Sequence, residues 1–189
     1  MKLLIIDNYD SFTFNLVQRV EEVGEKDYFI LKNDQLDAVQ ANDFEGVLIS
    51  PGPGIAQEAG QLVPFLQKFY TRKKMLGICL GFEALVELFG GKLSLLDFPL
   101  HGVQNKGTII QSNLLFQKID APFLMGHYHS WYVAPGDFPE VLESSVKDEQ
   151  GLIMGFRHKK YPLFGLQFHP ESYMTPQGGS MLKNWLQTL

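Results

Sequence analysis

The segment at residues 75–89 limits most strongly what this chain can fold into. An apolar run from Met75 to Ile78 leads directly into Cys79 and then into a helical pattern that continues to residue 89. Glycines at positions 77 and 81 flank the cysteine. They suit a sharp strand-to-helix turn, because a tightly bent backbone leaves no room there for side chains. The sequence therefore predicts a buried strand, a tight turn and a helix, with the chain's single cysteine at the turn.

Cys79 is a candidate nucleophile because of its place at this turn. The first N–H groups of a helix carry a partial positive charge, which favours the thiolate over the thiol. A cysteine buried for structural reasons is the alternative, since free cysteines are among the most buried residues. A reactive thiol also needs a base nearby, because with a pKa of ~8.5 it stays mostly protonated at neutral pH.

A segment near the C-terminus supplies a candidate base. The apolar run at residues 165–168 ends in His169, and a carboxylate follows at Glu171. Pro170 restricts the backbone between them, so the imidazole and the carboxylate keep a nearly constant relation. Glu171 can accept a hydrogen bond from one ring nitrogen, which leaves the other nitrogen to take the thiol proton. These residues predict a catalytic triad of Cys79, His169 and Glu171.

Strand and helix patterns alternate along the chain, which predicts an α/β fold. In the first half, strands are expected at residues 3–6, 27–31, 46–49 and 76–78, and helices at 11–23, 61–70 and 80–89. After residue 91, strands are expected at 92–95, 108–111, 141–146, 152–157 and 162–168, before a closing helix at 180–189. Repeated strand–helix units give parallel strands with both faces covered. We therefore expect one domain over residues 1–189, a three-layer sandwich in which helices flank a mixed, mostly parallel central sheet.

Length and composition narrow the class of protein. With 189 residues, 45% of them hydrophobic, the chain can bury one sizeable core. The formal net charge of −5 and the scattered lysines form no basic stripe, which argues against nucleic acid as a partner. A single cysteine makes no internal disulfide, and neither a signal segment nor an apolar stretch of membrane-spanning length is present. The expected location is cytoplasmic, without a membrane partner.

Three further segments are candidates for the site or its support. In the Ser-Pro-Gly-Pro-Gly loop at residues 50–54, prolines restrict the backbone and glycines expose it, so N–H groups can point at a ligand; a tight surface turn is the alternative. Residues 8–11 form either a helix cap or a support for the site. His127 and His129 lie one residue apart on an expected strand. No cysteine cluster or acidic third ligand accompanies them, so we expect a structural or substrate-shaping role and no metal.

Five motifs occur in order along nearly the whole chain: LIIDNYDSFT at residues 4–13, SPGPG at 50–54, GICLG at 77–81, YHSW at 128–131 and QFHPES at 167–172. Together they resemble the class I, or triad, glutamine amidotransferases. The resemblance is closest to the small subunits, or component II, of anthranilate synthase and of aminodeoxychorismate (para-aminobenzoate) synthase. It implies a glutaminase that needs no cofactor and supplies ammonia to a separate chorismate-binding synthase subunit, component I, with which it forms a heteromer.

The same resemblance implies roles for single residues. Cys79 would attack the side-chain amide carbon of L-glutamine, His169 would shuttle the proton, and Glu171 would orient His169. Glutamate and ammonia would be the products, released through a γ-glutamyl thioester. The N–H groups of Gly52 and Leu80 would stabilise the oxyanion. The substrate would be held by Gly52, Pro53, Gly54, Glu83, Ser130 and Trp131.

Two positions depart from the family's pattern. The family usually has His-Gln after the Cys-Leu-Gly turn, whereas this chain has Phe82 and Glu83. An ionised carboxylate cannot donate hydrogen bonds, so Glu83 can meet the ammonium group of glutamine but not its α-carboxylate. Val103 stands where the family tends to carry lysine, in a segment that often faces the synthase partner. Two alternatives therefore remain: a stand-alone cysteine hydrolase of γ-glutamyl compounds, and a regulatory subunit whose glutaminase is impaired by Glu83.

Overall fold

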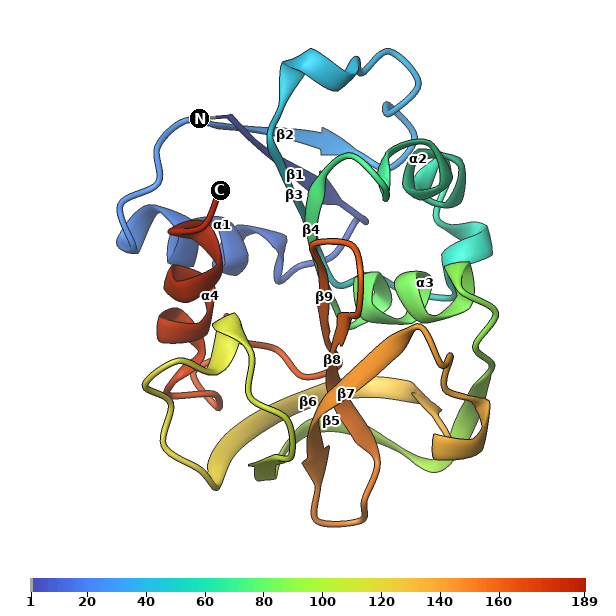
Figure 1. Cartoon of the computed structure of the whole chain (residues 1–189), viewed down its shortest axis with the longest axis vertical. Helices are drawn as coiled ribbons and strands as arrows, with labels where there is room; N and C mark the ends of the chain where they lie inside the picture. Colours follow the sequence, from blue (N-terminus) through green and yellow to red (C-terminus); the bar gives the residue numbers. More distant parts are fainter. Residues whose placement is uncertain (1) are drawn as a thin grey trace.

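Apolar runs in the first half of the chain form strands that are buried on both faces. The computed structural model describes residues 2–189, and its nine strands form one sheet in the order β2-β1-β3-β4-β9-β8-β7-β5-β6 (Figure 1). The first five strands in that order are parallel: β2 (Tyr28–Lys32), β1 (Leu3–Asp7), β3 (Gly46–Ile49), β4 (Lys74–Ile78) and β9 (Leu163–Leu166). Because parallel strands end at the same edge, their carboxyl ends form one rim of the sheet.

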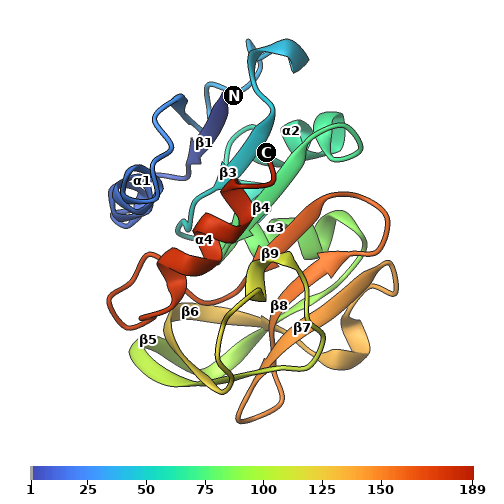
Figure 2. The same ribbon diagram turned by 60° about the vertical axis from the view of Figure 1, so that its left-hand side comes forward.

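The other four strands form the antiparallel half of the sheet (Figure 2): β8 (Ile153–His158), β7 (Leu142–Asp148), β5 (Leu93–Ile109) and β6 (Phe123–Val133). β5 is a single strand of 17 residues, whereas the sequence predicted two short strands joined by a turn. Its middle contains Asp97 and Pro99, which interrupt the apolar alternation, and the pairing register with β6 shifts there. The prediction of two strands was therefore wrong.

Helices cover both faces of the parallel half because successive strand residues point to opposite sides. The helices are α1 (Thr13–Glu22), α2 (Leu62–Phe69), α3 (Leu80–Leu88) and α4 (Gly178–Leu186). Leu4 and Ile6 of β1 pack with α2 and α3, whereas Leu3 and Ile5 pack with α1 and α4. Short 3₁₀ turns lie at η1 (Ala41–Asp43), η2 (Ala56–Glu58), η3 (Leu114–Phe116) and η4 (Pro135–Asp137). The predicted α/β sandwich with a mixed central sheet is confirmed, although the sheet has as many antiparallel as parallel strand pairs and is not mostly parallel.

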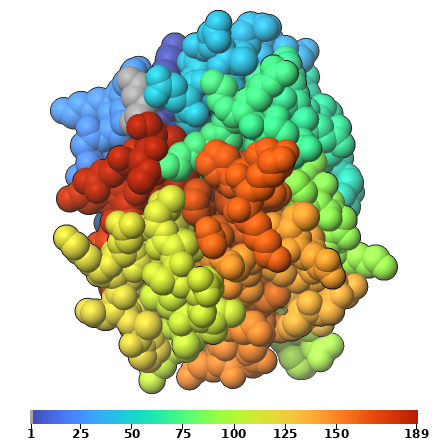
Figure 3. All heavy atoms as spheres, viewed as in Figure 1, coloured from blue at the N-terminus to red at the C-terminus, as the bar shows by residue number. Residues whose placement is uncertain are grey.

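The C-terminal helix α4 holds the two halves of the chain together on one face. It packs against α1 and against the η3 turn, and it lies between these two segments on the surface (Figure 3). Trp185 of α4 is fully buried in the same core as residues from β1 and β4. Within residues 2–189, no helix has both the length and the apolar character needed to cross a membrane.

Candidate active site

Cys79 lies at a sharp turn between β4 and α3, as the sequence predicted. Its backbone has φ 51° and ψ −103°, a left-handed conformation that residues with a side chain rarely adopt. The flanking glycines make the turn possible, because a Cβ on Gly77 would lie 2.3 Å from the carbonyl oxygen of Gly81. A backbone held in such a conformation by its surroundings is typical of functional sites.

The chain segment that carries His169 follows the strand next to Cys79. β4 and β9 are parallel neighbours, and the Cys79 N–H donates to the carbonyl oxygen of Leu166 at 2.8 Å. One residue further on, the side-chain nitrogen of Gln167 lies 4.0 Å from the Cys79 sulfur. Residues 79 and 169 therefore both lie just beyond the carboxyl ends of adjacent strands.

His169 and Glu171 form a buried pair with a defined direction. The His169 Nδ1–H donates to Glu171 Oε1 at 2.7 Å, and the two residues are 1% and 2% exposed. His169 Nε2 is also buried and has no hydrogen-bond partner within residues 2–189. The rings of Phe12 and Tyr128 pack edge-on against the imidazole, with centroids 5.4 and 4.9 Å away. The pair thus presents an oriented imidazole whose second nitrogen is available to accept a proton.

The surroundings of Cys79 oppose ionisation of its thiol. Burial raises the pKa of the Cys79 thiol well above its ordinary value, and the carboxylates of Glu83, Glu171 and Asp10 raise it further. The N–H of Leu80 acts in the opposite direction but is the smallest of these influences. The effect expected from sequence for the helix start is thus present, but burial and the carboxylates outweigh it. Attack by this sulfur requires a base to take its proton.

A cavity of about 140 Å³ opens beside the Cys79 sulfur. Its walls include all six residues that the sequence predicted for substrate binding, and three that it did not assign to the substrate: Gly52, Pro53, Gly54, Glu83, Ser130 and Trp131, and His101, Tyr128 and His129. The cavity therefore brings together the loop after β3, the first turn of α3 and the end of β6. The position of Tyr128 in the cavity wall could have been predicted from sequence, since Tyr128 belongs to the motif at residues 128–131.

The loop at residues 50–54 lies directly against the start of α3. A Cβ on Gly52 would lie 2.5 Å from Leu80 Cδ2 and 2.6 Å from Asn8 Cβ, so only glycine fits there. Asn8 anchors the loop, because its N–H donates to Ser50 Oγ and its side-chain nitrogen to the Ser50 carbonyl oxygen, both at 2.9 Å. Nearby, Asp10 accepts from the Phe12 N–H at 2.7 Å, just before α1. The motif at residues 8–11 thus supports both the loop and the helix start.

Glu83 is a buried carboxyl group in the wall of the cavity. It is 2% exposed, and its Oε1 accepts a hydrogen bond from the side-chain nitrogen of Gln167 at 2.9 Å. Burial raises the pKa of Glu83 to about 7; the hydrogen bond from Gln167 lowers it and the nearby Glu87 raises it. At neutral pH both protonation states of Glu83 are populated, so its charge toward the cavity depends on pH.

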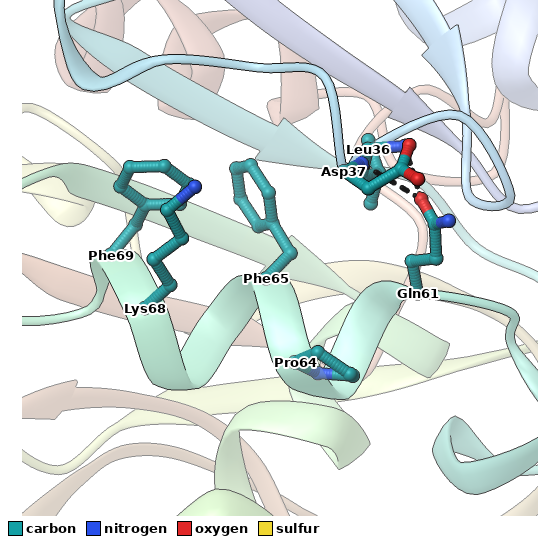
Figure 4. Close-up of a pocket in the computed structure, with 7 residues that line it drawn as sticks. All are labelled: Leu36, Asp37, Gln61, Pro64, Phe65, Lys68 and Phe69. Atoms are coloured by element: carbon teal, nitrogen blue, oxygen red, sulfur yellow. Dashed lines mark hydrogen bonds between the residues drawn. The ribbon is translucent and has the colours of Figure 1, made fainter.

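A second cavity, of about 260 Å³, lies away from the cysteine, between α2 and residues 36–37 (Figure 4). Gln61 bridges its two sides, since its side-chain oxygen accepts from the N–H groups of Leu36 and Asp37 at 2.5 and 2.9 Å. Phe65 and Phe69 form much of its wall. No histidine or cysteine contributes to it, and residues 2–189 contain no group of three or more metal-ligating side chains placed to hold an ion.

Known proteins are similar to this sequence over nearly its whole length. The sequence profile of the family described as "Glutamine amidotransferase class-I" matches residues 4–189. The chain belongs to this family. "Anthranilate synthase component 2" of Thermus thermophilus is 41% identical over 196 residues, covering 99% of this chain and 92% of that protein. "Aminodeoxychorismate/anthranilate synthase component 2" of Bacillus subtilis (strain 168) is 35% identical over 192 residues, covering 98% and 96%.

A solved structure has the same fold as this amidotransferase. It belongs to a Thermoplasma acidophilum protein described as a subunit of GMP synthase, and it aligns with a TM-score of 0.84 over 99% of this chain and 92% of that one. The two sequences are 22% identical, so the likeness concerns the fold. The sequence-based assignment of the chain to the class I glutamine amidotransferases is confirmed by the family match.

Proposed function

We propose that this chain hydrolyses L-glutamine to glutamate and ammonia through a thioester on Cys79, and supplies the ammonia to a chorismate-using synthase subunit. One observation carries the proposal: a thiol at a helix start lies at the same rim of the sheet as a buried imidazole whose Nδ1 is bound to Glu171 and whose Nε2 is open. The family match and the names of the relatives support it. Residues 1–189 would act as one amidotransferase domain, and a cytoplasmic location remains a prediction.

The proposed reaction moves one proton back and forth through His169. As the Cys79 sulfur attacks the amide carbon of glutamine, His169 Nε2 takes the thiol proton, and Glu171 stabilises the resulting imidazolium through Nδ1–H. His169 then gives that proton to the amide nitrogen, the C–N bond breaks, ammonia leaves and a γ-glutamyl thioester remains. Water attacks the thioester carbon while His169 accepts its proton, and return of the proton to sulfur releases glutamate and restores the thiol.

Two backbone donors are proposed for the oxyanion that forms during both attacks. The N–H groups of Gly52 and Leu80 belong to segments in direct contact beside Cys79. Each such donor is worth ~3 kcal/mol of transition-state stabilisation. We propose that Pro53, Gly54, Glu83, Ser130 and Trp131, which line the cavity, hold the rest of the glutamine molecule.

The proposed partner is a chorismate-binding synthase subunit that covers the rim around the cavity. Three aromatic side chains are exposed on segments next to the site: Tyr9 after β1 is 52% exposed, and Phe98 of β5 and Tyr173 after Glu171 are each 83% exposed. Exposed aromatic groups of this size are enriched where proteins associate. Ammonia released into water would be protonated and lose its nucleophilicity. A sealed contact between the two subunits at this rim would keep the ammonia out of water. The product of the synthase subunit would be anthranilate or 4-amino-4-deoxychorismate.

The proposal is tested by measuring ammonia release from glutamine with and without a chorismate-binding synthase subunit. We expect slow release by the isolated chain, faster release with the partner and chorismate, and formation of the aminated product. Fast ammonia release at a rate that does not depend on the partner would instead indicate a stand-alone hydrolase. No release in either case, with the partner bound, would indicate a regulatory subunit and contradict the proposed glutaminase.

Glu83 is expected to make glutamine binding depend on pH. Since the pKa of Glu83 is raised to about 7, the carboxyl is mostly protonated at pH 6 and mostly ionised at pH 8. Only the ionised form attracts the ammonium group of glutamine, so affinity should rise about tenfold from pH 6 to pH 8, following the ionised fraction. Calorimetry on the Cys79→Ala variant measures this binding without turnover.

Two controls isolate the carboxylate of Glu83 in that measurement. Glu83→Gln should remove the pH dependence, whereas Glu87→Gln, one turn along the same helix and outside the cavity wall, should keep it but move it to lower pH, because Glu87 raises the pKa of Glu83. Glutaric acid monoamide, which lacks the ammonium group, should bind with little change between the two pH values. A pH dependence that survives Glu83→Gln would show that another group controls binding.

A further inference from the structure

A series of three hydrogen bonds, buried or partly buried, runs along the β5–β6 ribbon behind the cavity. Asn105 Oδ1 lies 2.6 Å from His127 Nε2, and His127 Nδ1 lies 3.0 Å from His129 Nε2. His129 Nδ1 then lies 2.7 Å from the carbonyl oxygen of Trp131. His127 is fully buried and His129 is 3% exposed. This series of hydrogen bonds ends on the backbone of Trp131, a residue that lines the cavity beside Cys79.

The positions of the hydrogens in this series of contacts follow from its last acceptor, the carbonyl oxygen of Trp131. A carbonyl oxygen only accepts, so His129 Nδ1 must carry a hydrogen. Burial lowers the pKa of His127 to about 3 and of His129 to about 4, so both rings are neutral and carry one hydrogen each. His129 Nε2 therefore accepts from His127 Nδ1–H, and His127 Nε2 accepts in turn. Asn105 Oδ1 would then face a lone pair, so the assignment requires the Asn105 amide to be turned so that its nitrogen donates to His127 Nε2 in place of Asp148.

The backbone at the end of this chain lacks regular support from the sheet. Leu95 of β5 pairs with Trp131 and Leu100 pairs with His129, so residues 96–99 lie opposite Ser130 alone. A second register shift follows between His101 and Val103. The ordinary ladder of hydrogen bonds is thus interrupted where β6 borders the cavity. The side-chain hydrogen bonds supply an anchor for the backbone at this point.

We propose that the side chains of Asn105, His127 and His129 form a one-directional relay that holds the backbone at residues 130–131 in the shape that glutamine binding requires. This inference rests on the proposed glutaminase function for its kinetic consequence. His127 touches neither the cavity nor Cys79, so it is a positioning residue. Its loss affects how well the substrate is held rather than the chemistry at the sulfur.

Nitrogen NMR of the wild-type protein tests the relay directly and without glutamine. The chain has five histidines, which makes assignment of each ring practical. At pH 7, His127 and His129 should both be neutral and carry the hydrogen on Nδ1. An Nε2–H tautomer or a charged ring at either position would overturn the relay. This result is independent of whether the protein hydrolyses glutamine.

Kinetics of two His127 variants test the positioning role. His127→Leu removes both ring nitrogens and should raise KM for glutamine by about tenfold, with kcat changed less than about threefold, because the substrate wall loosens while the triad stays intact. His127→Asn places an amide nitrogen near the Nδ1 position and should recover most of the lost KM. His158→Leu, a matched change at a buried histidine of β8 outside this cavity, should leave KM near the wild-type value.

The outcomes separate this inference from the proposed function. If glutamine is hydrolysed but His127→Leu leaves KM unchanged, or if kcat falls as much as KM rises, the positioning role is wrong and the glutaminase stands. If the wild-type protein with its partner releases no ammonia, the proposed function is wrong and the NMR result alone decides the relay. If His127→Leu does not fold, His127→Asn and the wild-type tautomers still decide it.

Discussion

Replacing Cys79 with alanine is expected to lower glutamine hydrolysis by at least about 10,000-fold, the size of loss seen when a nucleophile is removed from a triad. The sulfur is the atom that would carry the γ-glutamyl group, and no other cysteine exists in the chain to replace it. The measurement is ammonia release in the presence of the synthase partner. Glutamine binding should survive, because the cavity walls come from residues on three other segments.

Two controls accompany the Cys79→Ala variant. Cys79→Ser should be nearly as inactive, since a buried hydroxyl is far less acidic than a thiol. Synthase activity with added ammonium salt should be kept in both variants, because the partner would use free ammonia and the small subunit would still dock. Substantial glutamine hydrolysis by either variant would exclude a thioester on Cys79.

Replacing His169 with alanine should produce the second-largest loss, of roughly 1,000-fold in kcat. The physical reason is the thiol itself, whose pKa burial and the nearby carboxylates raise well above its ordinary value. Without an imidazole to accept the proton, only the small ionised fraction of Cys79 can attack. Because that fraction grows as pH rises, the residual rate of His169→Ala should increase with pH across the neutral and alkaline range.

Wild-type activity should show no comparable rise, because in the intact site the proton passes to His169 Nε2 at the moment of attack. Glu171→Gln gives an intermediate case, since it keeps a partner for the His169 Nδ1–H but removes the charge that stabilises the imidazolium. A flat pH profile for His169→Ala, or activity within tenfold of the wild type, would contradict the role of His169 as the base.

Much of the parallel half of this fold could be predicted from sequence because its signals are local. Continuous apolar runs such as residues 3–6 and 76–78 form buried parallel strands, and the helices between them show regular spacing. β5 was harder, because Asp97 and Pro99 look like loop residues. They are accommodated where the strand bulges away from β6. Register shifts depend on the neighbouring strand, which a single sequence does not display.

The site shows the same division between local and non-local information. Cys79, His169 and the loop at residues 50–54 lie in motifs whose bends and strand ends are encoded nearby. The direction of the thiol pKa shift could not be predicted, since it depends first on burial, then on the nearby Glu83, and also on Glu171 and Asp10, which are distant in sequence. The contacts of His127 with Asn105 and His129 were not predicted from the sequence either. The spacing of the two histidines predicted a shared face, but the partner on β5 comes from the fold.

The central claim is that Cys79 is the nucleophile and that His169 activates it. The most direct measurement treats the protein, bound to its synthase partner, with a diazo-ketone analogue of glutamine and locates the covalent adduct by mass spectrometry. The account predicts one adduct per chain, on the Cys79 sulfur, formed in parallel with loss of ammonia release and greatly slowed in His169→Ala. Loss of activity with the adduct on another residue, or full activity with Cys79 modified, would contradict it.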